Sequence, residues 1–338
     1  MPRCVGAMLA VWCRMQKPRV LLTGATGFVG SHIYPTLIAR GFRVLCATRK
    51  PEEAAARDPK RDYVRFDLDD RSSVEQALAQ VDSAVYLVHS MSEGHAYAKR
   101  EHANAETFRR AAQSRGLERI VYLGGPRPRG RVSRHLESRL RTGETLREGS
   151  VPVVELQATM IIGGGSESFR IVRDLAARLP WMLLPKWLES KSEPVSIDDI
   201  GASIAHALSM PLSGSVVLGA PGPEVLSGRD IIMRTARALG QEPRVITVPL
   251  VTPRLSSYWI RLVTRTNPHV ATELVEGLRS DIVTHGPTIW SRMEDHERVS
   301  FDEAVKRALR EEAADLPAST KLVEKALHRI THAAPHEP

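Results

Sequence analysis

The chain has 338 residues, of which 42% are hydrophobic and 25% charged, a balance that excludes a disordered or fibrous protein. Its three cysteines (Cys4, Cys13 and Cys46) have no paired spacing and no neighbouring histidine cluster, which argues against a disulfide framework and a zinc site. No run approaches the ~20 apolar residues that span a bilayer. Composition therefore predicts a soluble, cytoplasmic protein with no bound metal and with one large domain or two modest ones.

The net charge of +8 comes from 47 Lys and Arg residues against 39 Asp and Glu residues. A basic chain can bind nucleic acid, an acidic membrane or an anionic small molecule. Here the basic residues are scattered through helical patterns and do not form a stripe with interleaved aromatic residues. This distribution favours an anionic cofactor and disfavours nucleic acid as the main ligand.

Residues 1–16 precede the first convincing element and contain an apolar stretch that superficially resembles a short signal peptide. No small-residue cleavage site follows it, so we expect an N-terminal extension, with Met15 as the natural start, and no export. We expect a nucleotide-binding domain over 17–157. A C-terminal substrate portion over 158–330 is expected to be interleaved with the sheet of that domain.

The first half of the chain alternates short apolar runs with amphipathic stretches. Predicted strands cover 19–22, 43–48, 63–66, 83–88, 119–123 and 153–156. Predicted helices follow the first strand through Ile38 and cover 72–79, 99–114 and 133–148. Strands and helices that alternate with short connections predict an α/β Rossmann fold with a doubly wound parallel sheet.

After residue 157 the alternation loosens, which predicts a smaller α/β substrate-binding subdomain. Its expected elements are helices at 169–179, 198–208, 228–239, 255–263 and 301–330 and strands at 216–218 and 245–248. Apolar and aromatic residues in this part predict a substrate wall or lid, with ordinary core as the alternative. These residues are Trp181, Met182, Trp187, Tyr258 and Trp259.

The strongest motif is Gly24-x-x-Gly27-x-x-Gly30, placed between the first strand and the first helix. The first glycine permits a tight turn, the second lets the backbone approach a pyrophosphate, and the third lets helix and strand pack closely. A helix N-terminus at this point attracts negative charge. We therefore predict a dinucleotide site that includes Thr26, Phe28 and Val29, the alternative being a glycine-rich turn without a ligand.

The second predicted strand ends in Thr48-Arg49-Lys50. An NAD site usually has an acidic residue there, which binds the ribose 2′-hydroxyl. Arg49 and Lys50 can instead pair with a 2′-phosphate, which predicts that NADP(H) is preferred over NAD(H). The alternative is a pair of solvated surface charges.

Together with the glycine motif, Asp67-Leu68 and the segment Val195–Ile200 resemble the extended and atypical short-chain dehydrogenase/reductases. The stretches 86–91, 121–125, 161–166, 255–259 and 301–305 are similar to the NmrA-like, YbjT-type branch of that superfamily. The resemblance implies that Asp67 and Leu68 flank the adenine. It also implies that Leu87, Val88 and His89 line the approach to the ribose and the nicotinamide.

The catalytic signature departs from this family. Its active members carry a Tyr-x-x-x-Lys pair and a serine, whereas this chain has His135 and Arg139 on the corresponding helix and Gly124-Gly125 at the end of the strand. By analogy, Arg139 would hold the nicotinamide ribose and His135 would transfer a proton, unless His135 is a surface residue. His89 is a further acid–base candidate, whereas Tyr122 is expected in the core.

These features favour an NADPH-dependent oxidoreductase that transfers hydride to an apolar small molecule. A non-catalytic NADP(H) sensor, regulator or assembly factor is the rival, and a cofactor-assisted isomerase or epimerase ranks third. We expect a monomer or a homodimer.

Overall fold

The computed structural model describes residues 17–89, 97–128, 130, 132–178, 181–242, 244–248 and 280–315. Only the backbone is described for residues 97, 178, 181–187, 244–248 and 315. The predicted helix at 255–263, Tyr258, Trp259 and the tail beyond 315 lie outside the described residues.

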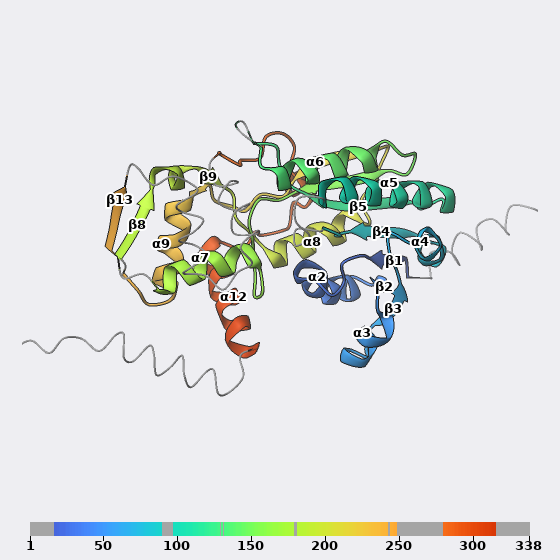
Figure 1. Ribbon diagram of the computed structural model, residues 1–338, viewed down its shortest axis with the longest axis horizontal. Helices are drawn as coiled ribbons and strands as arrows, with labels where there is room; N and C mark the ends of the chain where they lie inside the picture. The colour runs from blue at the N-terminus through green and yellow to red at the C-terminus, as the bar shows by residue number, and fades with distance from the viewer. Residues whose placement is uncertain are drawn as a thin grey trace, which may run out of the picture.

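A seven-stranded sheet organises the molecule, and all its strand pairs are parallel (Figure 1). The strand order is β11-β6-β5-β4-β1-β2-β3. Because the order reverses between β1 and β4, ligands are expected at the carboxyl ends of these two strands. The strands are β1 (Arg19–Leu22), β2 (Arg43–Thr48), β3 (Asp62–Arg65), β4 (Ser83–Tyr86), β5 (Arg119–Gly124), β6 (Val153–Gln157) and β11 (Val216–Gly219). The predicted doubly wound Rossmann fold is confirmed.

Helices cover both faces of the sheet (Figure 1). On one face α2 packs against α8, and on the other α4, α5 and α6 lie side by side. Their bounds are α2 (Phe28–Ala39), α4 (Arg71–Leu78), α5 (Tyr97–Arg115), α6 (Arg134–Arg147) and α8 (Ile197–Ala207).

One helix of this half was not predicted, α3 (Pro51–Arg57) between β2 and β3. It starts with a proline at the first helical position and has Glu52 and Glu53 in its first turn and Arg57 in its last. Each of these placements favours a helix. Its seven residues contain no repeating apolar pattern, so periodicity could not indicate it.

Beyond α8 and β11, the described part of the C-terminal half contains further helices and pairs of short strands. Its helices are α7 (Glu167–Arg178), α9 (Gly228–Ala238) and α12 (Phe301–Asp315), with 3₁₀ turns η2 (Lys186–Glu189) and η3 (Ile289–Arg292). Its strands are β7 (Ile161–Ile162), β8 (Trp181–Pro185), β9 (Lys191–Ser192), β10 (Val195–Ser196), β12 (Leu226–Ser227) and β13 (Arg244–Val248). They pair as β10–β7, β12–β9 and β13–β8.

The apolar stretch that predicted a substrate wall forms strand β8 and turn η2. β8 pairs in parallel with β13. The side chains of Trp181, Met182 and Trp187 are not described, so their role as a wall stays a prediction.

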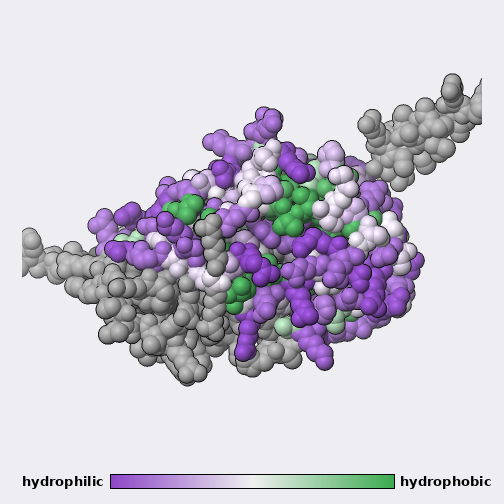
Figure 2. All heavy atoms as spheres, turned by 90° about the horizontal axis from the view of Figure 1, so that it is seen from above, coloured by the Kyte–Doolittle hydropathy of each residue, from purple (hydrophilic) through white to green (hydrophobic). Residues whose placement is uncertain are grey.

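The described apolar side chains gather in three buried clusters, one on each face of the large sheet and one among α7, α9 and α12. Tyr122 is fully buried, as predicted. Among the described residues, the large hydrophobic side chains that are exposed are Ile38 and Val225. Figure 2 accordingly shows a predominantly hydrophilic described surface with small, separate hydrophobic areas. No described helix combines the length and the apolar character that crossing a bilayer requires.

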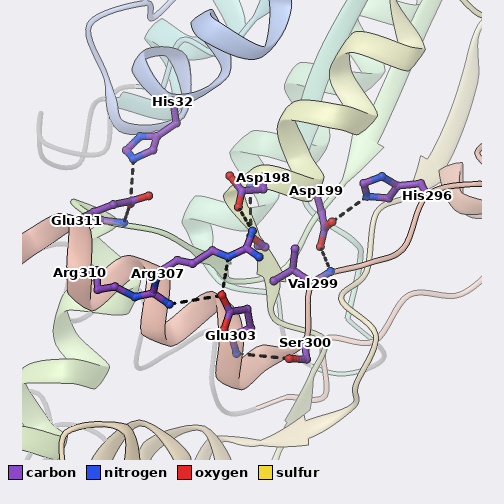
Figure 3. Close-up of polar contacts among 12 residues, drawn as sticks. His32, Asp198, Asp199, His296, Val299, Ser300, Glu303, Arg307, Arg310 and Glu311 are labelled. Carbon is purple, nitrogen blue, oxygen red and sulfur yellow. Dashed lines mark hydrogen bonds and ion pairs between the residues drawn. The ribbon is translucent and has the colours of Figure 1, made fainter. Parts of the chain in front are cut away.

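Ion pairs and hydrogen bonds join α12 and the preceding segment to α8 and α2 (Figure 3). Arg307 of α12 donates to Asp198 of α8 at 2.8 Å. The neighbouring Asp199 is fully buried and accepts from His296 Nε2 at 2.8 Å and from the Val299 amide at 3.0 Å. Glu311 lies 3.5 Å from His32 on α2.

Candidate cofactor site

The turn after β1 begins at Thr23, which is fully buried. Its hydroxyl donates to the Val85 carbonyl at 3.0 Å and accepts from the Leu87 amide at 2.9 Å. The side chain therefore holds the carboxyl ends of β1 and β4 together. Gly24 follows with φ +63°, a left-handed conformation that favours glycine, and the Gly27 amide donates to its carbonyl at 3.0 Å.

Gly30 and Gly27 have different structural roles. A Cβ at Gly30 would lie 2.8 Å from Ala25 Cα and would overlap the Gly24 carbonyl oxygen, so this glycine is needed for the helix to approach the turn. Gly27 is the N-cap of α2, with no side-chain cap and with no acidic residue in the first turn. The N-terminal amides of a 12-residue helix thus face the turn without a capping carboxylate, which suits a pyrophosphate.

A cavity of about 410 Å³ lies at the carboxyl ends of β1 to β4. The predicted cofactor residues that line it are Gly24, Thr26, Arg49, Lys50, Asp67, Leu68, Val88 and His89. Gly27, Phe28, Val29 and Gly30 form the adjoining turn and helix start. Residues that the sequence did not indicate also line it, namely Ala47, Thr48, Glu53, Ala54, Arg57, Phe66, Asp69, Arg100 and Asn104.

The cations of this cavity differ in their surroundings. Lys50 Nζ pairs with Glu53 at 2.7 Å, with both side chains more than half exposed, and Arg100 pairs with Asp69. The hydrogen bond from Lys50 holds the pKa of Glu53 below its usual value. Among the described residues, no carboxylate lies within ion-pair distance of Arg49. Arg57, which also lines the cavity, has no ion pair within the described part of the chain either, and Arg49 is the one of these two that directly follows the end of β2.

Arg139 lies beyond this cavity, on α6. Its Nη2 donates to the carbonyls of Leu123 and Gly124 at 2.9 and 3.0 Å, and its own carbonyl accepts from the Tyr122 hydroxyl at 2.8 Å. The guanidinium thus fastens α6 to the carboxyl end of β5. Gly124 and Gly125 stand where the family has a serine. A Cβ at Gly125 would lie 2.9 Å from a methyl of Leu136, so Gly125 has little room for a side chain. The role of Arg139 on the nicotinamide ribose stays a prediction.

The two candidate histidines lie close together, with ring centroids 6.5 Å apart. Burial lowers the pKa of His135 to about 3, with a contribution from the charge of Arg139. The pKa of His89 is also held well below its usual value, first by burial and then by Arg139 and His135. Both imidazoles are therefore neutral at neutral pH, and either role as a charged proton donor stays a prediction.

A buried carboxylate lies beneath this pair. Glu101 of α5 is 4% exposed, accepts from the Ser138 hydroxyl and approaches His89 Nδ1 at 4.0 Å. Among the described residues, no group of three or more His, Cys, Asp or Glu side chains is placed to hold a metal ion.

Comparison with known proteins agrees with this geometry. Residues 20–148 match the sequence profile of the NAD dependent epimerase/dehydratase family. This match runs from β1 to the end of α6, and the region is similar to that family. The glycine turn, the uncapped start of α2 and the cavity beside them fit a nicotinamide dinucleotide.

Individual relatives cover more of the chain at low identity. The ceramide reductase of Caulobacter vibrioides is 23% identical over 236 residues, which are 68% of this chain and 73% of that protein. The structure of Citrobacter sp. triphenylmethane reductase with NADP(H) superposes with a TM-score of 0.66 and 15% identity, over 86% of this chain and 99% of its own. The structure of Bordetella bronchiseptica WbmH with NAD⁺ gives a TM-score of 0.63 and 14% identity, over 88% of this chain and 99% of its own. At these identities the two structures show a common fold.

Proposed function

We propose that this protein is an NADP(H)-dependent oxidoreductase of the atypical, NmrA-like branch, which transfers hydride between the nicotinamide and an apolar small molecule. The observation that carries the proposal is Arg49, which follows β2 and lines the cofactor cavity with no described carboxylate beside it. An NAD site would place an acidic residue at this point, whereas a guanidinium suits a 2′-phosphate.

Two relatives support reduction of the substrate as the direction of the reaction. One is named a ceramide reductase and the other a triphenylmethane reductase, so both names describe a reduction.

The bound nicotinamide would supply or accept the hydride. The residues of the chain would bind and orient it: the amides at the start of α2 would hold the pyrophosphate, and Arg49 would hold the 2′-phosphate. Arg139 keeps α6 in place against the end of β5. His89 and His135 are neutral at neutral pH. In this proposal they exclude water and orient the group that donates a proton to the substrate, and they carry no charge themselves.

The test is a fluorescence titration of the full chain with NADPH and NADH. NADPH should bind at least about tenfold more tightly, since a charge-assisted contact contributes about 1.5–3 kcal/mol. Arg49→Ala should remove this preference. Arg43→Ala, an equal loss of charge at the opposite end of β2, should keep it. Equal affinities for the two dinucleotides would refute the NADP(H) preference.

Turnover is tested separately, by following NADPH absorbance with quinones, enones and imines. If the chain uses the family's geometry, Arg139→Ala should lower turnover about 100-fold, because small misplacements of the reacting groups cost that much. NADPH affinity should change much less.

A second candidate, a non-catalytic NADP(H) sensor, is favoured by the arrangement around Arg139. Its Nη2 is engaged with two main-chain carbonyls, and the tyrosine, lysine and serine of the active family members are absent. Tight NADPH binding without turnover of any substrate in the panel would favour this candidate over the oxidoreductase.

A further inference from the structure

A second cavity, of about 270 Å³, lies against the C-terminal part of α6, which lines it with Leu140, Glu144 and Arg147. Its polar lining comes from the loop after β5, from α6, from β6 and from the segment at 283–285. It shares no lining residue with the dinucleotide cavity. The polar residues that line it are Arg127, Glu144, Arg147, Glu155, Gln157 and His285.

The floor of this cavity is an ion pair on an inner strand of the sheet. Glu155 of β6 has a side chain that is 2% exposed, and it pairs with Arg147 of α6. Its Oε1 also accepts from Gln157 Nε2 at 3.0 Å. Arg147 is 27% exposed, and partial burial lowers its pKa.

Two glycines make the space for this carboxylate. A Cβ at Gly124 would lie 3.0 Å from Glu155 Oε1, and a Cβ at Gly143 would overlap the carboxylate. Gly143 lies in the interior of α6, where glycine is destabilising relative to alanine.

These features are poorly explained by stability. A buried ion pair is often no more stable than apolar side chains of the same volume, and here it also requires a glycine inside a helix. Residues that break local rules in this way concentrate at functional sites. Because they converge on the floor of a cavity, the arrangement favours a ligand site.

The charges of the cavity indicate the class of ligand. At the rim, Arg127 pairs with Glu144 at 3.4 Å, with the two side chains 62% and 54% exposed. Floor and rim thus each offer one guanidinium and one carboxylate, with no net charge between them. A simple anion or cation would meet repulsion as well as attraction at both levels, whereas a molecule that carries both charges can pair with both.

We propose that this cavity binds a small zwitterion of the amino-acid type. Its carboxylate would pair with Arg127 or Arg147, and its ammonium group with Glu144 or Glu155. The volume is below the usual range for drug-sized ligands, which suits a small metabolite. The proposal is independent of the oxidoreductase function, because it concerns a separate cavity.

The experiment is calorimetric titration of the full chain with three matched probes. These are L-norvaline, which carries both charges, pentanoate, which carries the carboxylate alone, and butylamine, which carries the ammonium group alone. Norvaline should bind saturably and at least tenfold more tightly than either fragment. Glu155→Gln should weaken norvaline at least tenfold, and Glu144→Gln, at the exposed rim, about threefold.

Glu148→Gln is the matched control, because Glu148 is exposed just past the end of α6 and does not line the cavity. It should leave norvaline affinity unchanged. NADPH titration of each variant reports whether the fold is intact. If Glu155→Gln does not fold, Glu144→Gln decides the question. The proposal is overturned if norvaline does not saturate, if a fragment binds as tightly, or if a folded variant of Glu144 or Glu155 binds norvaline like the wild type.

Discussion

The two halves of the molecule treat their polar groups differently. In the nucleotide-binding half, the amides at the start of α2 have no side-chain cap and Arg49 has no described carboxylate beside it. In the C-terminal half, polar groups satisfy one another: Arg234 joins Glu224 to Asp302, and both oxygens of Asp199 are used (Figure 3). The open groups of the glycine turn are suited to a dinucleotide, whereas the satisfied groups around Arg234 and Asp199 hold short elements together.

This difference predicts that substitutions at the open groups of the glycine turn change binding without stability, and that substitutions at satisfied groups such as Asp199 do the reverse. The largest effect should follow Gly27→Val. Gly27 is in an extended conformation (φ −82°, ψ 175°) that valine can adopt. The branched side chain would cover the open amides of α2, so NADPH affinity should fall by at least about 100-fold in a fluorescence titration.

The thermal midpoint of Gly27→Val should stay within a few degrees of the wild type. Gly30→Ala is the contrasting variant, because its Cβ would overlap the Gly24 carbonyl oxygen and should destabilise the fold itself. Normal NADPH binding by a folded Gly27→Val would mean that the dinucleotide lies elsewhere.

In the C-terminal half, Asp199→Ala should lower the free energy of unfolding by about 2–3 kcal/mol. It removes a fully buried acceptor and leaves the Val299 amide without its hydrogen bond. Asp198→Ala, one residue earlier, breaks an ion pair of side chains that are 53% and 44% exposed and should cost less than about 1 kcal/mol. Urea denaturation measures both.

NADPH affinity of the folded Asp199→Ala protein should be unchanged. A large loss of affinity at full stability would show that the segment before α12 belongs to the binding machinery, and the contrast between the two halves would fail.

The sequence indicated most of the sheet and the glycine turn, because both have local signatures. Strands such as β2 are continuous apolar runs, and the spacing of Gly24, Gly27 and Gly30 carries its own steric meaning. Arg57 was missed because its helix is short and has no apolar period. Glu155 was missed because one glutamate in an apolar strand has no local sign, and its partner Arg147 comes from another element.

Arg139 shows a third kind of difficulty. Its place on the helix follows from the resemblance to the family, but its hydrogen bonds to the Leu123 and Gly124 carbonyls depend on how α6 packs against β5. The sequence motif does not encode how α6 packs against β5. It could therefore assign Arg139 to the helix but could not predict its hydrogen-bond partners.

A smaller effect is expected from His135. Its pKa is about 3 in the folded protein and about 6.5 in the unfolded chain. The unfolded state therefore binds more protons below about pH 6.5, and stability should fall as the pH drops from there toward 3. By this linkage His135 accounts for about 1–2 kcal/mol of the loss at pH 5.

His135→Gln should reduce that loss, measured as the difference in urea midpoint between pH 7.5 and pH 5. Part of the loss should remain, because the pKa of His89 is shifted in the same direction. An unchanged difference would mean that His135 is solvated, as an ordinary surface histidine would be.

The smallest effect is expected at Arg57, in the last turn of α3 and on the wall of the cofactor cavity. It lies near enough to Glu53 to lower the pKa of that carboxyl, so its charge is partly offset and its pull on a 2′-phosphate should be weaker than that of Arg49. We expect Arg57→Ala to weaken NADPH about threefold and to leave NADH unchanged. Lys60→Ala, an equal loss of charge on the exposed loop after α3, should alter neither affinity. If NADH weakened as much as NADPH, Arg57 would be acting on a part common to both dinucleotides, and the phosphate would then be held by Arg49 without help from α3.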